Sequence, residues 1–114
     1  MSAIVWRKTK TDLPEDFEAR LCQRLAGRVE SAYIFGSYGT PEFRPDSDVD
    51  LILVKQSERP FVERPREFND LYDLFPRMDI LVYEPEELED LLKESVGFWA
   101  SVRSTLRRLP VAVA

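Results

Sequence analysis

Histidine is absent from this sequence of 114 residues, and cysteine occurs once, as Cys22. The absence of histidine excludes Ser-His and Cys-His catalysis, histidine-ligated zinc and histidine general bases. A single cysteine cannot form an intrachain disulfide, and we interpret Cys22 as a small buried side chain and not as a nucleophile. Acid–base chemistry must therefore come from carboxylates, lysines, tyrosines or a metal-bound water.

Long hydrophobic runs are also missing, and no stretch reaches the length that a membrane span requires. The apolar run at 4–6 is too short for a signal peptide and is followed by basic residues. We therefore expect a cytoplasmic protein that does not associate with membranes. The net charge of −5 argues against strong binding of duplex nucleic acid as its main task. It permits a nucleotide substrate or a nucleic-acid end as acceptor, because bound Mg²⁺ can supply positive charge.

The length allows one hydrophobic core, and a composition of 44% hydrophobic and 32% charged residues is ordinary for a globular protein. We expect a single domain over 1–114, with a core over about 13–92 and a C-terminal helical segment over 97–109. Residues 1–11 are expected to form a loose lead-in, with Ile4 and Trp6 against the core.

Apolar spacing predicts the first half of the fold. Apolar residues recur every four positions over 13–26, which indicates a helix with Asp12 as its N-cap. Strands are expected at 32–35 and 49–54. The second of these is apolar at nearly every position after its start, which is typical of a strand at the centre of a sheet.

The second half of the sequence predicts further helices around a third strand. A polar connection over 55–64 leads to an amphipathic helix that ends at Pro76. A strand at 78–83 follows, and Pro85 opens another helix. The direct link between the first two strands indicates an α/β fold with a small mixed β-sheet flanked by helices. We expect these aromatic side chains in the core: Tyr33, Phe35, Phe68, Tyr72 and Phe75.

The loop between the first two strands carries the candidate chemistry. The turn Gly36-Ser37 can offer backbone N–H groups and a hydroxyl to phosphate oxygens. Ten residues later, Asp48 and Asp50 leave the same face of a strand and can hold a divalent cation. Asp79 completes the set if the 49–54 and 78–83 strands are neighbours. Three such carboxylates can hold two Mg²⁺ ions about 4 Å apart, as in-line phosphoryl displacement requires.

Each of these features has a simpler interpretation when it is taken alone. Gly36-Ser37 suits an ordinary turn, Asp46 and Asp48 suit caps in a solvated loop, and Asp79 suits an ion pair with Arg77. Their order and spacing together resemble the signature of the DNA polymerase β-type nucleotidyltransferase superfamily. The short chain resembles its minimal nucleotidyltransferase branch over about 13–92.

Members of that branch are typically encoded beside a HEPN-domain ribonuclease toxin and act as its antitoxin. The resemblance implies transfer of AMP from ATP, with Mg²⁺, to a hydroxyl, which we expect to be a tyrosine of the toxin. Gly36 and Ser37 would bind the β,γ-phosphates and help to release pyrophosphate. Asp48 and Asp50 would ligate the two metals, and Asp79 would complete the site and help to deprotonate the acceptor.

The sequence departs from the family pattern after the Gly-Ser turn. Family loops often carry a basic residue soon after the turn, whereas here the first is Arg44. Triphosphate binding would then depend on Arg44, Lys55 or Arg77. The segment 97–114 matches no family feature and is a candidate for packing on the partner.

Other interpretations stay open on the sequence alone. The chain can be an antitoxin that neutralises its partner by occlusion, with a vestigial site. It can also be a small-molecule nucleotidyltransferase similar to aminoglycoside-modifying enzymes, although these usually have an additional domain. Phe98 and Trp99 are expected in the core or, if exposed, as an interface anchor. The sequence does not specify the nucleobase or a homo- or hetero-oligomeric state.

Overall fold

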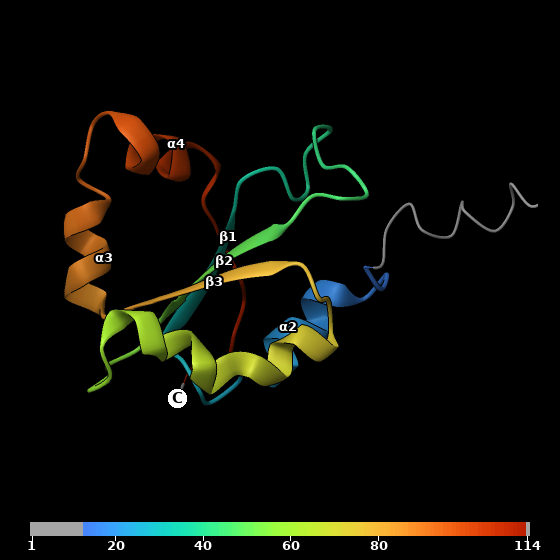
Figure 1. Ribbon diagram of the computed structural model, residues 1–114, viewed down its shortest axis with the longest axis horizontal. Coiled ribbons are helices and arrows are strands. Elements are labelled where there is room, and N and C mark those ends of the chain that lie inside the picture. Colours follow the sequence, from blue (N-terminus) through green and yellow to red (C-terminus); the bar gives the residue numbers. More distant parts are fainter. Residues whose placement is uncertain (1–12, 114) are drawn as a thin grey trace, which may run out of the picture.

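The computed structural model describes residues 13–113, so the proposed lead-in and the predicted N-cap Asp12 lie outside the described residues. Within this range a four-stranded sheet in the order β3-β2-β1-β4 lies between helices (Figure 1). No helix in the same range has the length and apolar character to cross a membrane. The elements in chain order are α2 Phe17–Leu25, β1 Ser31–Phe35, β2 Val49–Val54, η2 Phe61–Asp73, β3 Met78–Tyr83, α3 Pro85–Leu91, α4 Gly97–Thr105 and β4 Arg107–Arg108.

The sheet is mixed and β2 is one of its central strands, as predicted. β2 runs antiparallel to β1, to which the 36–48 loop joins it directly, and parallel to β3, which returns after η2. The register sets Phe35, Asp50 and Asp79 side by side across three strands. Residues paired in this way share a face of the sheet.

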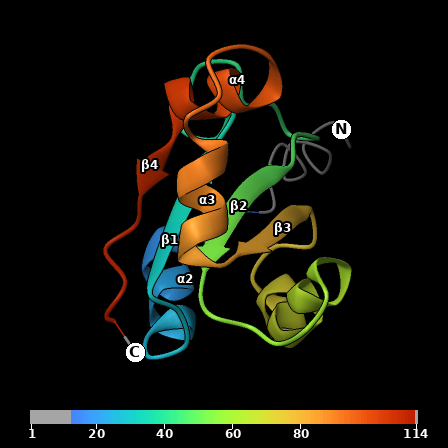
Figure 2. The same cartoon turned by 90° about the vertical axis from the view of Figure 1, so that its left-hand side faces the viewer.

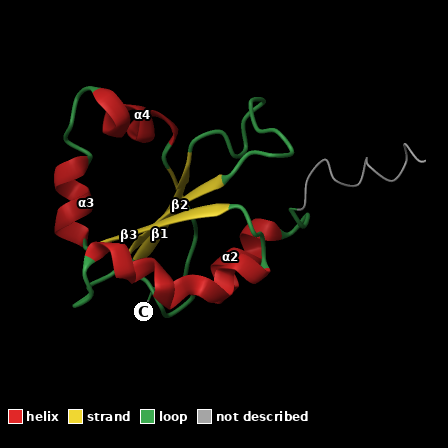
Figure 3. Cartoon of the chain, viewed as in Figure 1, coloured by secondary structure: helices red, strands yellow, loops and turns green. Residues whose placement is uncertain are grey.

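Helices lie on both faces of the sheet (Figure 3), and each face buries a different set of side chains. α2 and η2 cover one face, where Phe17, Phe68 and Phe75 pack on the alternate strand residues in the larger apolar cluster. α3 and α4 lie on the other face, over a smaller cluster around Phe35 and Ile52. Burying one such side chain contributes about 1.5–3 kcal/mol, so the larger cluster supplies most of the hydrophobic stabilisation.

The first helix is shorter than the predicted 13–26. α2 begins at Phe17, because the chain first makes a turn in which the Phe17 N–H donates to the Pro14 carbonyl at 3.1 Å. Asp16 occupies the N-cap position with φ −100° and ψ 30°. At the other end, Arg28 donates to both carboxylate oxygens of Asp70 at 3.0 Å and so ties the helix to η2.

The end of the predicted polar connection and most of the predicted amphipathic helix form one run of 3₁₀ turns, η2, with a kink at Phe68. Pro65 lies within it, and its missing N–H prevents a continuous α-helical ladder. A 3₁₀ helix repeats every three residues, so Phe68, Leu71 and Leu74 point inward and are buried. Tyr72 is 38% exposed, and its predicted place in the core is wrong for this reason.

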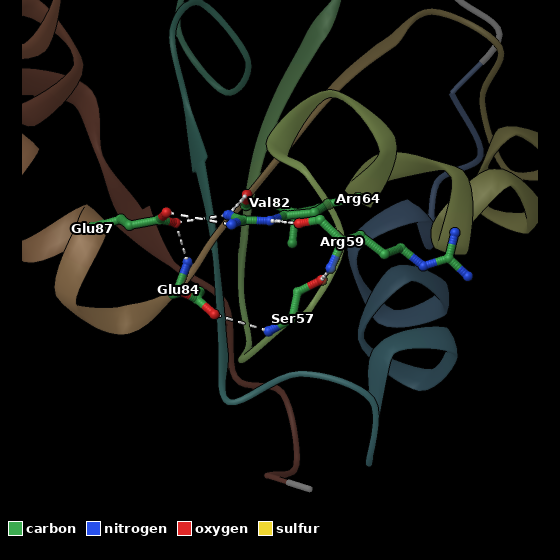
Figure 4. A network of polar contacts seen from close by, with 6 residues as sticks. All are labelled: Ser57, Arg59, Arg64, Val82, Glu84 and Glu87. Atoms are coloured by element: carbon green, nitrogen blue, oxygen red, sulfur yellow. Dashed lines mark hydrogen bonds and ion pairs between the residues drawn. The ribbon is translucent and has the colours of Figure 1, made fainter.

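A buried arginine joins η2, β3 and α3 (Figure 4). Arg64 is only 7% exposed and donates to the Arg59 carbonyl at 3.0 Å, the Val82 carbonyl at 3.2 Å and the Glu87 carboxylate at 2.7 Å. Glu87 also accepts from the Glu84 N–H, which forms the capping box that starts α3. The hydrogen bond from Arg64 lowers the pKa of Glu87 below its ordinary value.

The C-terminal segment differs from the helix predicted over 97–109. α4 ends at Thr105, Leu106 is extended, and the next two residues form β4 against β1 (Figure 2). The spacing of apolar residues is helical throughout this segment and does not predict the change from helix to strand. The outer edge of β1 has backbone groups that need partners, and pairing with β4 satisfies them.

Candidate functional site

Asp50 and Asp79 lie next to each other at the starts of two parallel strands. They are direct partners in the β2–β3 register, so their side chains leave the same face of the sheet, the one that α3 and α4 cover. Asp48 precedes Asp50 by two residues. Asp48 and Asp79 are exposed and Asp50 is half-buried, so the rim of the sheet presents carboxylates to solvent.

The environment of Asp50 disfavours its charged form. Burial is the largest cause that raises its pKa to about 6, followed by the charge of Asp79, a hydrogen bond with Asp79 and the charge of Asp48. Neighbouring carboxylates repel each other, and a proton or a cation between them relieves this repulsion. A divalent cation at the rim can therefore take the place of a proton and stabilise the charged carboxylates.

Gly36 brings the loop turn into contact with this carboxylate pair. Its φ is +84°, and a Cβ atom there would lie 2.6 Å from Oδ2 of Asp50. No other residue type fits both the backbone conformation and this close approach. The turn continues through Ser37, whose carbonyl accepts from the Thr40 N–H at 2.9 Å and from the Thr40 hydroxyl at 2.6 Å.

The backbone N–H of Gly36 already has a partner within the chain. It donates to Oγ1 of Thr105 at 2.9 Å, at the last residue of α4. The predicted phosphate donor is thus joined to the C-terminal segment, a contact that the sequence analysis missed. No local pattern reveals it, because the two residues are 69 positions apart.

The donor set of the rim suits a hard divalent cation, because it consists of carboxylate oxygens. Asp50 and Asp79 are adjacent, and Asp48 acts on Asp50 through its charge. As the side chains stand, no group of three or more carboxylate or thiol side chains in residues 13–113 converges on one point to hold a metal. The chemistry of the residues fits Mg²⁺, and binding requires the three carboxylates to turn toward one another.

A cavity of about 260 Å³ opens beside the aspartate pair, with these residues around it: Phe35, Asp50, Asp79, Ile80, Leu81 and Phe98. Its walls other than the aspartates are apolar. Phe98 comes from α4 and meets the rings of Phe35 and Trp99 edge-on, with centroids at 6.3 Å and 5.4 Å. Phe98 is 59% exposed, whereas Trp99 is half-buried against the smaller apolar cluster.

The cations predicted to bind a triphosphate lie in different places. Arg44 is exposed in the loop, and Arg77 donates to the carbonyl of Pro45. Lys55 is five residues beyond Asp50, about 16 Å along the strand at the usual rise, and pairs with Glu67 at 2.5 Å. The basic side chain beside the glycine turn is instead Arg107 of β4, which lies within the segment predicted as helical over 97–109.

The chain belongs to the nucleotidyltransferase domain family, whose model matches residues 15–113. Membership of this family supports nucleotidyl transfer as its general function. The match extends beyond the predicted 13–92 and includes α4 and β4, so the C-terminal segment is part of the family domain.

A solved structure of a candidate nucleotidyltransferase from Sulfolobus solfataricus is similar to this chain at 20% sequence identity, with a TM-score of 0.47. The similarity covers 64% of this chain and 66% of that one. No curated protein matches the sequence at a significant level.

Proposed function

We propose that the protein transfers AMP from ATP, in the presence of Mg²⁺, to a hydroxyl group on a partner protein. The observation that carries the proposal is the contact between Gly36 and Asp50. A turn suited to phosphate oxygens touches a carboxylate suited to a metal, and Asp79 lies on the far side of that carboxylate. Domains of this family typically use nucleoside triphosphates and divalent metals.

In this proposal Asp48, Asp50 and Asp79 hold Mg²⁺, which would neutralise phosphate charge during in-line displacement. Gly36 and Ser37 hold the β,γ-phosphates. The acceptor oxygen forms a bond to the α-phosphorus, the bond to the pyrophosphate oxygen breaks, and pyrophosphate leaves. Asp79 is exposed at the cavity and receives the proton of the acceptor hydroxyl.

The cavity beside Asp79 suits an aromatic acceptor. Phe35, Ile80, Leu81 and Phe98 offer apolar and aromatic surface to an incoming ring. A tyrosine phenol can place its ring there and its hydroxyl at the carboxylate, whereas a sugar would lose hydrogen bonds to water. By resemblance to the minimal nucleotidyltransferases, the partner would be a HEPN-domain toxin, and modification of its tyrosine would silence it.

One contact favours a second candidate function, an antitoxin that neutralises by binding and transfers little or no nucleotide. The Gly36 N–H donates to Thr105, so one phosphate donor of the turn is engaged within the chain. In this second function nucleotide binding is weak, while the surface that contacts the partner is unchanged.

Transfer of radiolabel distinguishes the two functions. The wild-type chain is incubated with α-³²P-ATP, Mg²⁺ and a HEPN-domain partner, alongside the double variant Asp48→Ala/Asp50→Ala. The control is Asp46→Ala, which removes an exposed carboxylate from the same loop. We expect the partner to be labelled by the wild type and the control, and not by the double variant. Neutralisation of the toxin by the double variant, with no label transferred by the wild type, would support binding alone.

A further inference from the structure

Arg107 lies against the glycine turn that follows β1. Its Nη2 atom is 3.2 Å from the point where a Cβ atom of Gly39 would lie. Gly39 has φ +81° and no side chain, so the guanidinium can approach the backbone of the turn. A cation from the C-terminal strand thus stands where the loop itself has none between Ser37 and Arg44.

The pairing of β4 with β1 directs this side chain. Arg107 pairs with Ile34, and Arg108 pairs with Tyr33. Successive side chains leave opposite faces of a strand, so the two arginines diverge. Arg107 reaches α2 and the turn, while the Arg108 guanidinium lies 6.0 Å from the ring centroid of Tyr33 on the other face.

A hollow of about 290 Å³ lies between the turn and the end of α4, with this lining: Gly36, Tyr38, Gly39, Thr40, Ser104, Thr105, Leu106 and Arg107. Glycine backbone, hydroxyl groups and a guanidinium are the groups that bind phosphate oxygens in proteins. Gly36 lines this hollow and also lies against Asp50, so it connects the hollow with the carboxylates. A chain of phosphates can therefore run from the carboxylates into the hollow.

The present partners of Arg107 are weak enough to be exchanged. Its ion pair with Glu18 is 3.7 Å long, and the two side chains are 48% and 42% exposed. The guanidinium also lies 5.8 Å from the ring centroid of Tyr38. An exposed pair at this distance contributes little to stability, whereas an arginine can bind a phosphate with two parallel hydrogen bonds.

We propose that Arg107 supplies the positive charge that the loop after Ser37 lacks, and that the hollow binds the terminal phosphates of a nucleoside triphosphate. The inference rests on the proposed function for the orientation of the nucleotide, with its α-phosphate at Asp50. Glu18 holds the guanidinium until the nucleotide arrives. Arg107 is thus a binding residue that separates triphosphates from monophosphates.

Nucleotide binding in Mg²⁺ tests this inference, with ATP and AMP as probes and Arg107→Ala, Arg107→Lys and Arg108→Ala as variants. Arg108 is the matched control on the same strand and the opposite face. We expect Arg107→Ala to weaken ATP binding roughly 10- to 100-fold, as loss of charged hydrogen bonds does, and to leave AMP binding unchanged. Arg107→Lys should restore part of the loss, and Arg108→Ala should bind as the wild type does.

Equal ATP affinities of Arg107→Ala and Arg108→Ala would overturn the inference, as would equal losses for ATP and AMP. Melting curves for all variants show whether folding is intact. Glu18→Gln keeps the size of the side chain and removes the charge that pairs with Arg107, so it should tighten ATP binding. The labelling assay separates this idea from the proposed function. If Arg107→Ala labels the partner with the wild-type KM for ATP, the inference is contradicted and the proposed function is not. If ATP binding depends on Arg107 but the wild type labels no partner, the transfer function is contradicted and the inference is not. Failure of the wild type to bind ATP contradicts both.

Discussion

Gly36 is the residue at which backbone conformation and site geometry coincide. Alanine there meets both a positive φ and the Asp50 carboxylate at 2.6 Å. Gly27 has a similar φ of +77°, but no atom lies within 4 Å of the position that a Cβ atom would take. Alanine at Gly27 therefore measures the free-energy cost of the backbone conformation alone. The pair of glycines therefore separates strain from contact with the site.

We predict that Gly36→Ala abolishes nucleotidyl transfer and lowers the free energy of unfolding by more than Gly27→Ala, whose cost should be about 1 kcal/mol. The physical reason is that the added methyl group displaces Asp50 from Asp79. Urea unfolding and the labelling assay measure the two effects. Transfer by Gly36→Ala at the rate of Gly27→Ala would contradict the close approach of the turn and the carboxylate.

Phe98 is an exposed aromatic residue whose ring forms part of a cavity wall. We predict that Phe98→Ala raises the KM for an aromatic acceptor up to about tenfold, the scale of one aromatic pair. Stability should change little, because the ring is largely in solvent. Val96→Ala is the control, since Val96 is also exposed on the approach to α4 but does not line the cavity. An unchanged KM for Phe98→Ala would remove the cavity as the acceptor site.

At the scale of elements, the Arg64–Glu87 contact holds three segments together, η2, β3 and α3. Arg64 lowers the pKa of Glu87. A carboxyl whose pKa is lowered by folding stabilises the protein above its unfolded pKa, about 4.3 for glutamate. This stabilisation is lost as the pH falls through the lower folded pKa.

We therefore predict that Glu87→Gln lowers the melting temperature at neutral pH, and that the difference from wild type narrows in acid below the ordinary glutamate range. Melting curves from pH 7 down to about pH 3 cover that window. Glu89→Gln, exposed on the same helix, controls for the loss of one negative charge. A wild-type advantage over Glu87→Gln that persists undiminished into strong acid would exclude the ion pair as its source.

The elements also show where local patterns are sufficient. The sequence predicts the strands at 49–54 and 78–83 at their observed bounds, because a run of apolar and β-branched residues specifies a buried strand locally. For η2 the sequence predicts an α-helix with Tyr72 inward, since the spacing of apolar residues fits both helical periods. Pro65 disfavours the α-helix, and the 3₁₀ helix places Phe68 and Leu71 in the same core.

At the scale of the whole molecule, the C-terminal segment is part of the folded unit. Val102 and Leu109 are buried in the two apolar clusters, and β4 covers the edge of β1. The segment predicted as helical over 97–109 is a helix only to Thr105, and the strand that follows it packs with the rest of the chain. The 97–113 segment brings Phe98, Thr105 and Arg107 to the candidate site.

We predict that a chain ending at residue 96 loses at least about 4 kcal/mol of stability, the cost of removing buried apolar side chains, and no longer unfolds cooperatively. A chain ending at 112 should unfold as the full chain does, because Val113 is exposed. Circular dichroism during urea titration measures both. A stable, cooperative chain ending at 96 would contradict the packing of this segment.

The sequence by itself determined which chemical groups are present for catalysis and binding. It contains no histidine, it has a glycine turn ten residues before an aspartate pair, and a further aspartate begins a later strand. The resemblance built on these residues led to the nucleotidyltransferase family, although the roles of the individual residues stay predictions. Such features are legible because turns and buried strands are specified by neighbouring residues.

Only the tertiary structure decided which distant groups meet at that chemistry. Thr105 reaches the Gly36 N–H across 69 residues, and Arg107 reaches the turn because β4 pairs with the outer edge of β1. That edge exists only after the sheet has formed, and its unpaired backbone groups then outweigh the helical tendency of the segment. No local sequence pattern can predict the stabilisation from this pairing, because the two strands lie far apart in the chain.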